Sequence, residues 1–248
     1  MTDAVAEPQP QPEKVNPLQR IGGVLFSPSE TFESIARRPD WVVPLLVLII
    51  VSIVSAWLIA SHVDADDLAR QAMEQNPKFS TFPVEQQNRM LSFTASMFRA
   101  MRYIGPTLSI VLLLVVAGAL LLGVRAMGGK GNFLQAFSVA IYGWYPRLIK
   151  GIIAVIVLMN KKSLSMFTLQ DPLRSSLGFL VDPKAKPVMF ALLSSFDIFT
   201  FWSLALYVIG YSAISRLSRG KTAAVVITLW LVVVLLSLIG PAMQGLRK

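Results

Sequence analysis

Two charged residues and a proline lie inside one long apolar stretch of the chain. This stretch runs from Ala136 to Met159, which is long enough to cross a bilayer, yet Pro146, Arg147 and Lys150 fall near its middle. Charged side chains are costly in hydrocarbon and there mark paired or functional positions. A later apolar stretch contains Asp197, whose carboxylate could neutralise these cations. The predicted polar cluster comprises Arg147, Lys150, Asp197, Tyr142, Tyr145 and Pro146.

The expected depth of these charges supports a pairing between the two stretches. If the stretches form antiparallel helices, Lys150 and Asp197 each lie about eight residues, or roughly 12 Å, from the same end. Arg147 lies one turn from Lys150 on the same face. We therefore expect Asp197 to contact Lys150, Arg147 or both. Three interpretations remain open: a structural ion pair that fixes helix register, a headgroup or anion pocket in which Arg147 holds a phosphate, and an ion or proton path.

The composition predicts an all-helical, polytopic membrane protein. Of 248 residues, 54% are hydrophobic and only 15% are charged, against about 25% charged in a typical soluble domain. The apolar residues fall in runs, which is typical of membrane-spanning helices. The net charge of +9 favours anionic lipid headgroups as partners. Nucleic-acid binding is not indicated, because the sequence has no basic stripe interleaved with aromatic residues. The chain has no cysteine and one histidine, so we expect neither a metal site nor a cofactor.

The apolar runs define five expected spans within a membrane domain covering residues 41–245. They are placed at 41–61, 104–124, 136–159, 189–214 and 223–243. Residues 62–103 form a polar extramembrane segment whose second half predicts a Met-rich amphipathic helix. Residues 1–15 are rich in proline and glutamine and are expected to be disordered. The glycine-rich turn at 128–131 lacks the spacing of a phosphate-binding loop and predicts a tight basic hairpin turn.

Two short amphipathic helices are expected within residues 16–40, ahead of the first span. Asn16-Pro17 and Ser27-Pro28-Ser29-Glu30 are typical helix starts, with a capping residue followed by proline. These helices either lie in the headgroup plane or form a cap packed on the end of the bundle, and the sequence leaves both possibilities open. The residues predicted to contact the interface are Arg20, Phe26, Phe32, Arg37, Arg38 and Trp41.

Several segments of the chain resemble a known family. The segments are FSPSETF, GGKGNFLQAF, YGWYPRLI and FDIFTFWSLALYVIGYSAISRLSRGKT, and over residues 17–245 the chain is similar to the bacterial form of the Yip (Ypt/Rab-interacting protein) family. The resemblance implies a five-span bundle in a bacterial inner membrane with a cytoplasmic N-terminus, although the distribution of basic residues alone slightly favours the reverse orientation. Eukaryotic members act in vesicle trafficking and Rab binding. The resemblance supplies no catalytic residues.

From these features we expect a non-enzymatic integral membrane protein that organises membrane lipids or protein partners. The expected partners are lipids with anionic headgroups, with a membrane-protein partner or a second copy of the chain also possible. The alternative is a small transporter or lipid and anion carrier built around Arg147, Lys150 and Asp197. No HExxH, GxGD or GxSxG pattern lies in or beside a span, which counts against an intramembrane enzyme.

Overall fold

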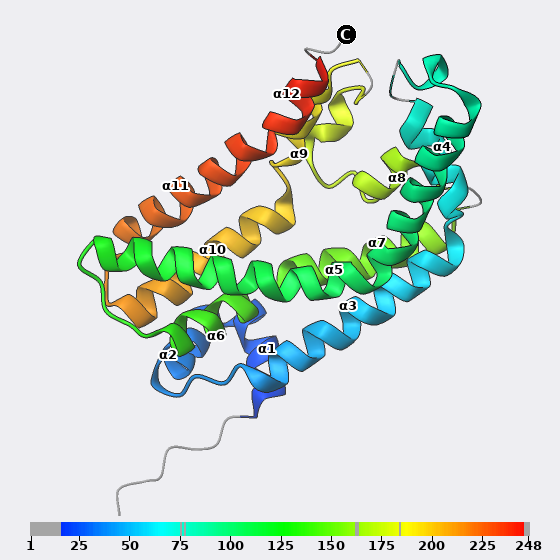
Figure 1. Cartoon of the computed structure of the whole chain (residues 1–248). Helices are drawn as coiled ribbons and strands as arrows, with labels where there is room; N and C mark the ends of the chain where they lie inside the picture. Colours follow the sequence, from blue (N-terminus) through cyan, green and yellow to red (C-terminus); the bar gives the residue numbers. More distant parts are fainter. Residues whose placement is uncertain (1–15, 75, 77, 162–163, 184, 246–248) are drawn as a thin grey trace, which may run out of the picture.

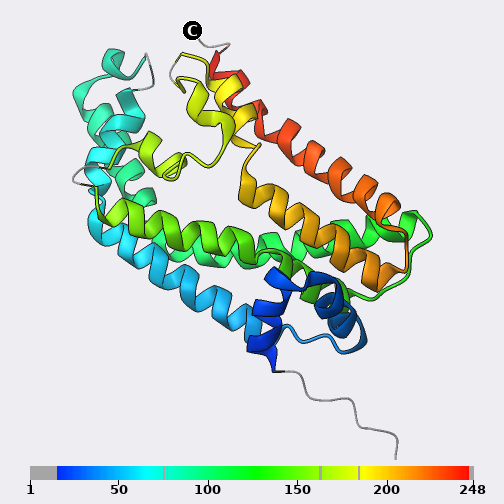
Figure 2. The ribbon, with the colours of Figure 1, turned by 180° about the vertical axis from the view of Figure 1, so that it is seen from behind.

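The computed structural model is built almost entirely from helices (Figures 1 and 2). It describes residues 16–74, 76, 78–161, 164–183 and 185–245, so the tail predicted to be disordered lies outside the described residues. Within this part of the chain, five helical segments are long and apolar enough to span a membrane. They are Val42–His62, Val84–Ala126, Phe133–Met159, Ile198–Ser215 and Arg219–Met243. The prediction of an all-helical fold with five spans is therefore confirmed.

The two N-terminal helices pack against the end of the bundle. Helix α1 (Pro17–Phe26) begins after Asn16, whose side chain accepts a hydrogen bond from the backbone N–H of Leu18. Helix α2 (Pro28–Arg37) packs on α6 and α10, and it fully buries Phe32 and Ile35. The sequence allowed helices in the headgroup plane or a cap packed on the end of the bundle, and α1 and α2 pack as such a cap.

The second expected span and the amphipathic helix before it form one continuous helix. Helix α3 (Val42–His62) leads away from the N-terminal cap to α4 (Ala65–Glu74) and the short η1 (Phe79–Thr81). Helix α5 then runs unbroken over Val84–Ala126, with Pro106 inside it. The sequence indicated an amphipathic helix and a separate span from residue 104, and the structure joins the two into one helix, whose polar part packs along α4.

The third span is interrupted, and the segment expected to form the fourth span is divided. The third consists of α6 (Phe133–Gly143) and α7 (Tyr145–Met159), separated at Trp144. The expected span at 189–214 was wrong as a continuous helix, because it divides into α9 (Pro187–Ser194) and α10 (Ile198–Ser215). The connection between α7 and α9 contains α8 (Met166–Gln170) and η2 (Leu177–Leu180). Both interruptions lie close to members of the predicted polar cluster.

The bundle has two clearly different ends (Figure 1). Helices α1, α2 and α6 lie at one end, which we call the cap end, whereas α4, α8, α9 and α12 (Ile239–Gly245) lie at the other, which we call the distal end. Helix α11 (Arg219–Ser237) runs from the cap end back to the distal end. The first described residues and the last ones therefore lie at opposite ends, as an odd number of spans requires.

The core sits where α2, α5, α6 and α10 meet. Tyr211 on α10 is fully buried, and its hydroxyl donates to the backbone carbonyl of Ala136 at 3.0 Å. The residue directly before it, Gly210, lets α2 and α6 approach α10 closely. A Cβ at this position would lie 2.4 Å from Val139 and 3.0 Å from the Phe32 ring. This contact fixes the cap on α6 and α10, and so positions the basic turns described below.

Candidate functional site

Lys150 and Asp197 form an ion pair between α7 and the start of α10. The Lys150 Nζ lies 2.7 Å from a carboxylate oxygen of Asp197, and the two side chains are 27% and 3% exposed. Ser175 donates a hydrogen bond to the same carboxylate oxygen. The other oxygen accepts the backbone N–H groups of Phe199 at 2.9 Å and Thr200 at 3.2 Å. The carboxylate is thus almost fully satisfied by the protein.

The position of Asp197 in the helix differs from the one that the sequence predicted. The sequence placed it inside a continuous span, but it is the N-cap residue of α10, immediately after the interruption that follows α9. A carboxylate at this position offsets the unpaired N–H groups and the partial positive charge of the helix N-terminus. Lys150 then neutralises the carboxylate, so the pair has a structural role at the break.

Arg147 does not join this ion pair. Its guanidinium stacks over the ring of Trp144, 4.8 Å from the centroid, and within the part of the chain that the structure describes it has no carboxylate partner. Trp144 is the residue at the break between α6 and α7. The cation–π contact offsets part of the cost of placing the Arg147 charge in the span, but it does not neutralise that charge.

The remaining members of the predicted polar cluster lie elsewhere. The Tyr142 hydroxyl lies 3.1 Å from a carboxylate oxygen of Asp40, and the Tyr145 hydroxyl donates to the backbone carbonyl of Pro44 at 2.8 Å. Pro146 is buried in the first turn of α7, where its missing N–H costs little. The sequence predicted six residues in one cluster, but the fold separates them into the ion pair, the stacked arginine and a tyrosine pair that faces α3.

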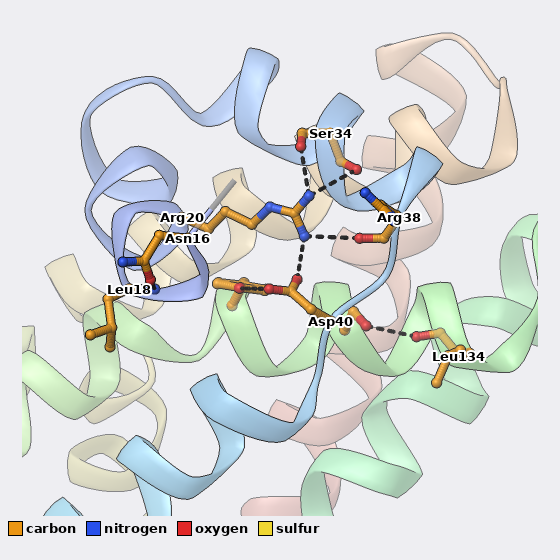
Figure 3. Close-up of polar contacts among 9 residues, drawn as sticks. Asn16, Leu18, Arg20, Ser34, Arg38, Asp40 and Leu134 are labelled. Atoms are coloured by element: carbon orange, nitrogen blue, oxygen red, sulfur yellow. Dashed lines mark hydrogen bonds and ion pairs between the residues drawn. The ribbon is translucent and has the colours of Figure 1, made fainter. Parts of the chain in front are cut away.

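A second polar network, centred on Arg20, links α1, α2 and the start of α3 (Figure 3). The Arg20 guanidinium contacts Asp40 at 2.6 Å, the Arg38 carbonyl at 2.8 Å and the Ser34 hydroxyl at 2.8 Å. Arg20 is 5% exposed and Asp40 is 25% exposed. Through Tyr142, the same carboxylate also reaches α6. This network fixes the cap relative to the first span.

Burial removes two of the six residues predicted to contact the interface. Arg20 is enclosed in the network described above, and Phe32 is fully buried in the core, so neither is available to lipid. Phe26 is 86% exposed at the end of α1, and Trp41 is 37% exposed ahead of α3. Arg37 and Arg38 are exposed at the end of α2. The sequence placed Arg20 in the headgroup plane because it gave no sign that Asp40 would be its partner.

Three exposed basic residues from separate segments converge on one cavity at the cap end. This basic cavity has a volume of about 440 Å³. Its cations are Arg37 from the end of α2, Lys130 from the turn before α6, and Arg216 from the turn after α10. Glu33 is the acidic residue in its lining. The cavity therefore has an excess of positive charge and can hold an anionic group.

The backbone around the basic cavity brings the two turns together. The N–H of Lys130 donates to the carbonyl of Ser215 at 2.9 Å, which joins the turn before α6 to the end of α10. Gly131 has a φ of 110° and Arg216 a φ of 59°, both in the left-handed region. The Gln135 side chain donates to the Ala36 carbonyl at 2.7 Å, which connects the turn to α2. The glycine-rich turn is thus a hairpin turn, as its spacing indicated, and it carries one side of this cavity.

Comparison with known proteins supplies one match. The family model described as the Yip1 domain matches residues 22–240, which is most of the chain. No curated protein and no solved structure matches this chain. The matched region includes the N-terminal helices from the middle of α1 onward, the first four spans, most of the fifth, and both turns of the basic cavity.

Proposed function

We propose that this chain, which belongs to the Yip1 domain family of multi-pass membrane proteins, is a non-enzymatic protein that binds and organises anionic lipids at the cap end. The observation that carries this proposal is the basic cavity, where Arg37, Lys130 and Arg216 converge on one volume. A phosphate or phosphodiester headgroup fits this chemistry because arginine pairs with phosphate oxygens in a bidentate manner and lysine adds a point charge.

The location of the basic cavity supports a lipid as the ligand. Its lining residues come from the end of α2 and from the turns that join the spans, and we expect this position to lie at the level of the headgroups of one leaflet. The exposed Phe26 and Trp41 at the same end are suited to the interfacial region. With the N-terminus in the cytoplasm of a bacterial cell, as proposed from the family resemblance, this end faces the leaflet in which a negative surface potential attracts basic residues.

The organising role that we propose needs contacts beyond one chain. A protein that holds anionic lipids on one face concentrates them beside its own spans, and a membrane-protein partner or a second copy of the chain would extend that effect. The long apolar faces of α3, α5 and α11 leave room for such contacts, since much of each helix is exposed outside the core. Binding of lipid, however, is the part of the proposal that a direct measurement can decide.

The test compares two double variants of the full chain by native mass spectrometry after reconstitution with an anionic and a zwitterionic phospholipid. In Lys130→Gln/Arg216→Gln we expect weaker retention of the anionic lipid, by roughly 30-fold, because each basic residue near the surface contributes about 1 kcal/mol. The control, Arg70→Gln/Arg89→Gln, removes the same charge from exposed residues in α4 and in the first turns of α5. Equal retention in both variants would refute the proposal.

A second candidate function, an anion or lipid carrier, is favoured by Arg147. This cation lies within the third span and, among the described residues, no carboxylate neutralises it. An anionic headgroup that reached it would remove an energetic cost. The Lys150–Asp197 pair argues the other way, since its carboxylate is satisfied by protein groups and neither residue lines the basic cavity. We therefore rank the carrier second.

A further inference from the structure

A large apolar cavity lies at the distal end, between α3, α5 and α7. Its volume is about 710 Å³, and residues of α4 and α8 also line it. The faces that line it are mostly aliphatic and come from helices that span the membrane. Among the lining residues are Ile59, Phe98, Ala154, Val155 and Leu158. A cavity of this size and lining, formed between spans, suits a hydrocarbon chain better than a polar solute.

Gly151 leaves space at the inner side of this apolar cavity. Together with Ala154, Val155 and Leu158 it occupies one face of α7, at helical spacing. A Cβ built on Gly151 would have no atom within 4 Å. A glycine inside a helix costs roughly 0.5–1 kcal/mol relative to alanine, and here no close packing of a neighbouring helix explains it. The space extends the apolar cavity toward the middle of α7.

The outer rim of the apolar cavity carries one charge of each sign without an opposite partner. Arg102 stacks on Trp57 and Tyr103, with 5.4 Å and 5.5 Å to the ring centroids, and has no carboxylate partner within the described ranges. Asp64 accepts the backbone N–H of Asp66 at 2.8 Å but has no basic side chain as a partner within those ranges. Exposed Trp and Tyr side chains are typical of the bilayer interface.

The other two rim charges already neutralise each other. Arg99 contacts a carboxylate oxygen of Asp66 at 2.6 Å. The rim therefore has no net charge. Arg102 and Asp64 remain as one cation and one anion that a ligand could contact. An anionic lipid could use only Arg102 and would face repulsion from Asp64, whereas a zwitterion can use both groups.

We infer that the apolar cavity binds a zwitterionic phospholipid whose headgroup carries a primary amine. One acyl chain occupies the space beside Gly151, the phosphate contacts Arg102, and the ammonium group contacts Asp64. This site lies at the distal end, away from the basic cavity, and takes a lipid of different charge. The inference goes beyond the proposed function, because it assigns a second lipid class to the opposite leaflet.

The test uses a substitution in the full chain that fills part of the apolar cavity. Gly151→Leu places a side chain in the space that the acyl chain would occupy, and leucine is the better helix former. Gly118→Leu on α5 is the matched control: it is also a helical glycine whose Cβ would meet no atom within 4 Å, and Gly118 does not line the apolar cavity. Each variant is reconstituted with equal amounts of phosphatidylethanolamine and phosphatidylglycerol bearing the same acyl chains, and the bound lipids are counted by native mass spectrometry.

We expect Gly151→Leu to lose bound phosphatidylethanolamine by roughly tenfold, which corresponds to about two methylene groups no longer buried. Gly118→Leu should retain it. Wild-type retention in Gly151→Leu, or an equal loss in both variants, would overturn the inference. Phosphatidylglycerol held by Lys130 and Arg216 should be unaffected in Gly151→Leu, so failure here is distinguishable from failure of the proposed function.

A headgroup variant provides an independent measurement if Gly151→Leu does not fold. Asp64→Asn keeps an oxygen that can cap α4 but removes the negative charge from the rim. It should shift the ratio of bound lipids toward phosphatidylglycerol by roughly tenfold, the size of one surface charge interaction of about 1 kcal/mol or slightly more. An unchanged ratio would contradict the assignment of Asp64 to the ammonium group.

Discussion

Neutralising Asp197 isolates the contribution of its ion pair with Lys150. In Asp197→Asn, the asparagine can still accept the N–H groups of Phe199 and Thr200, so the cap of α10 is retained. The Lys150 ammonium is left without its carboxylate and one turn from the Arg147 cation. Breaking a buried pair costs about 3–5 kcal/mol. Because Lys150 is 27% exposed, we expect the lower end, about 3 kcal/mol.

The reverse substitution should cost less. Lys150→Met leaves the Asp197 carboxylate unpaired, but this group keeps hydrogen bonds from Ser175 and from two backbone N–H groups. We expect a loss of about 2 kcal/mol, the usual cost of a buried polar group that loses one partner. In the double variant Lys150→Met/Asp197→Asn no charge is left stranded, so the loss should be about 1 kcal/mol.

The measurement is reversible unfolding of the full chain in lipid micelles or bicelles, with all four proteins compared under the same conditions. A coupling of about 4 kcal/mol between the two sites follows from the single and double losses expected above. Additive losses would show that the two side chains do not stabilise each other. The structural explanation of the pair would then fail, and an ion or proton path through these residues would regain support.

Two further predictions concern the other buried or unpaired arginines. Asp40→Asn leaves the enclosed Arg20 guanidinium without its carboxylate partner, so the free energy of unfolding should fall by about 3 kcal/mol. Stability equal to wild type in the same unfolding experiment would show that the network in Figure 3 does not hold the cap. Arg147→Gln removes a charge that has no carboxylate partner among the described residues, so the free energy of unfolding should be unchanged or higher. If the carrier function holds, native mass spectrometry should find one fewer anionic lipid bound to this variant. A large loss of stability in Arg147→Gln would instead assign this residue a structural role.

The number of spans could be predicted from the sequence because it depends on the length of apolar runs alone. The lengths of individual helices could not. Helix α5 continues for 43 residues, and its polar part is stabilised by packing on α4, a contact between distant segments that hydropathy does not report. The division of the fourth span did have a local signal. Asp197 comes two residues after the Ser194-Ser195 pair and precedes an apolar run, which is a typical helix start that the continuous hydrophobicity obscured.

Pairings between distant residues were predictable only where a strong physical constraint applied. A charge inside a span needs a partner, and the similar depths of Lys150 and Asp197 indicated one, which the structure contains. Arg20 and Asp40 lie outside the spans, where charges are inexpensive, so nothing required them to pair. The fold brings them together because α1 packs on both α2 and α3, and Ser34 and Arg38 at the end of α2 contact the Arg20 guanidinium. The basic cavity has the same origin, since its cations come from three segments that are separated in sequence.

The break before α10 explains why this protein carries an ion pair among apolar helices. The break before α10 lies beside α11, where the Phe196 ring packs on Trp230 at 5.6 Å, near the middle of the last span. Helix N-termini exposed at such depth need hydrogen-bond acceptors, which Asp197 supplies, and Asp197 in turn needs Lys150. Backbone geometry therefore accounts for that pair without any ligand. Arg147 lies near the other break, and the same explanation does not apply to it, because a guanidinium has no acceptor and cannot cap N–H groups. Its guanidinium stacks on the Trp144 indole and, among the described residues, forms no ion pair.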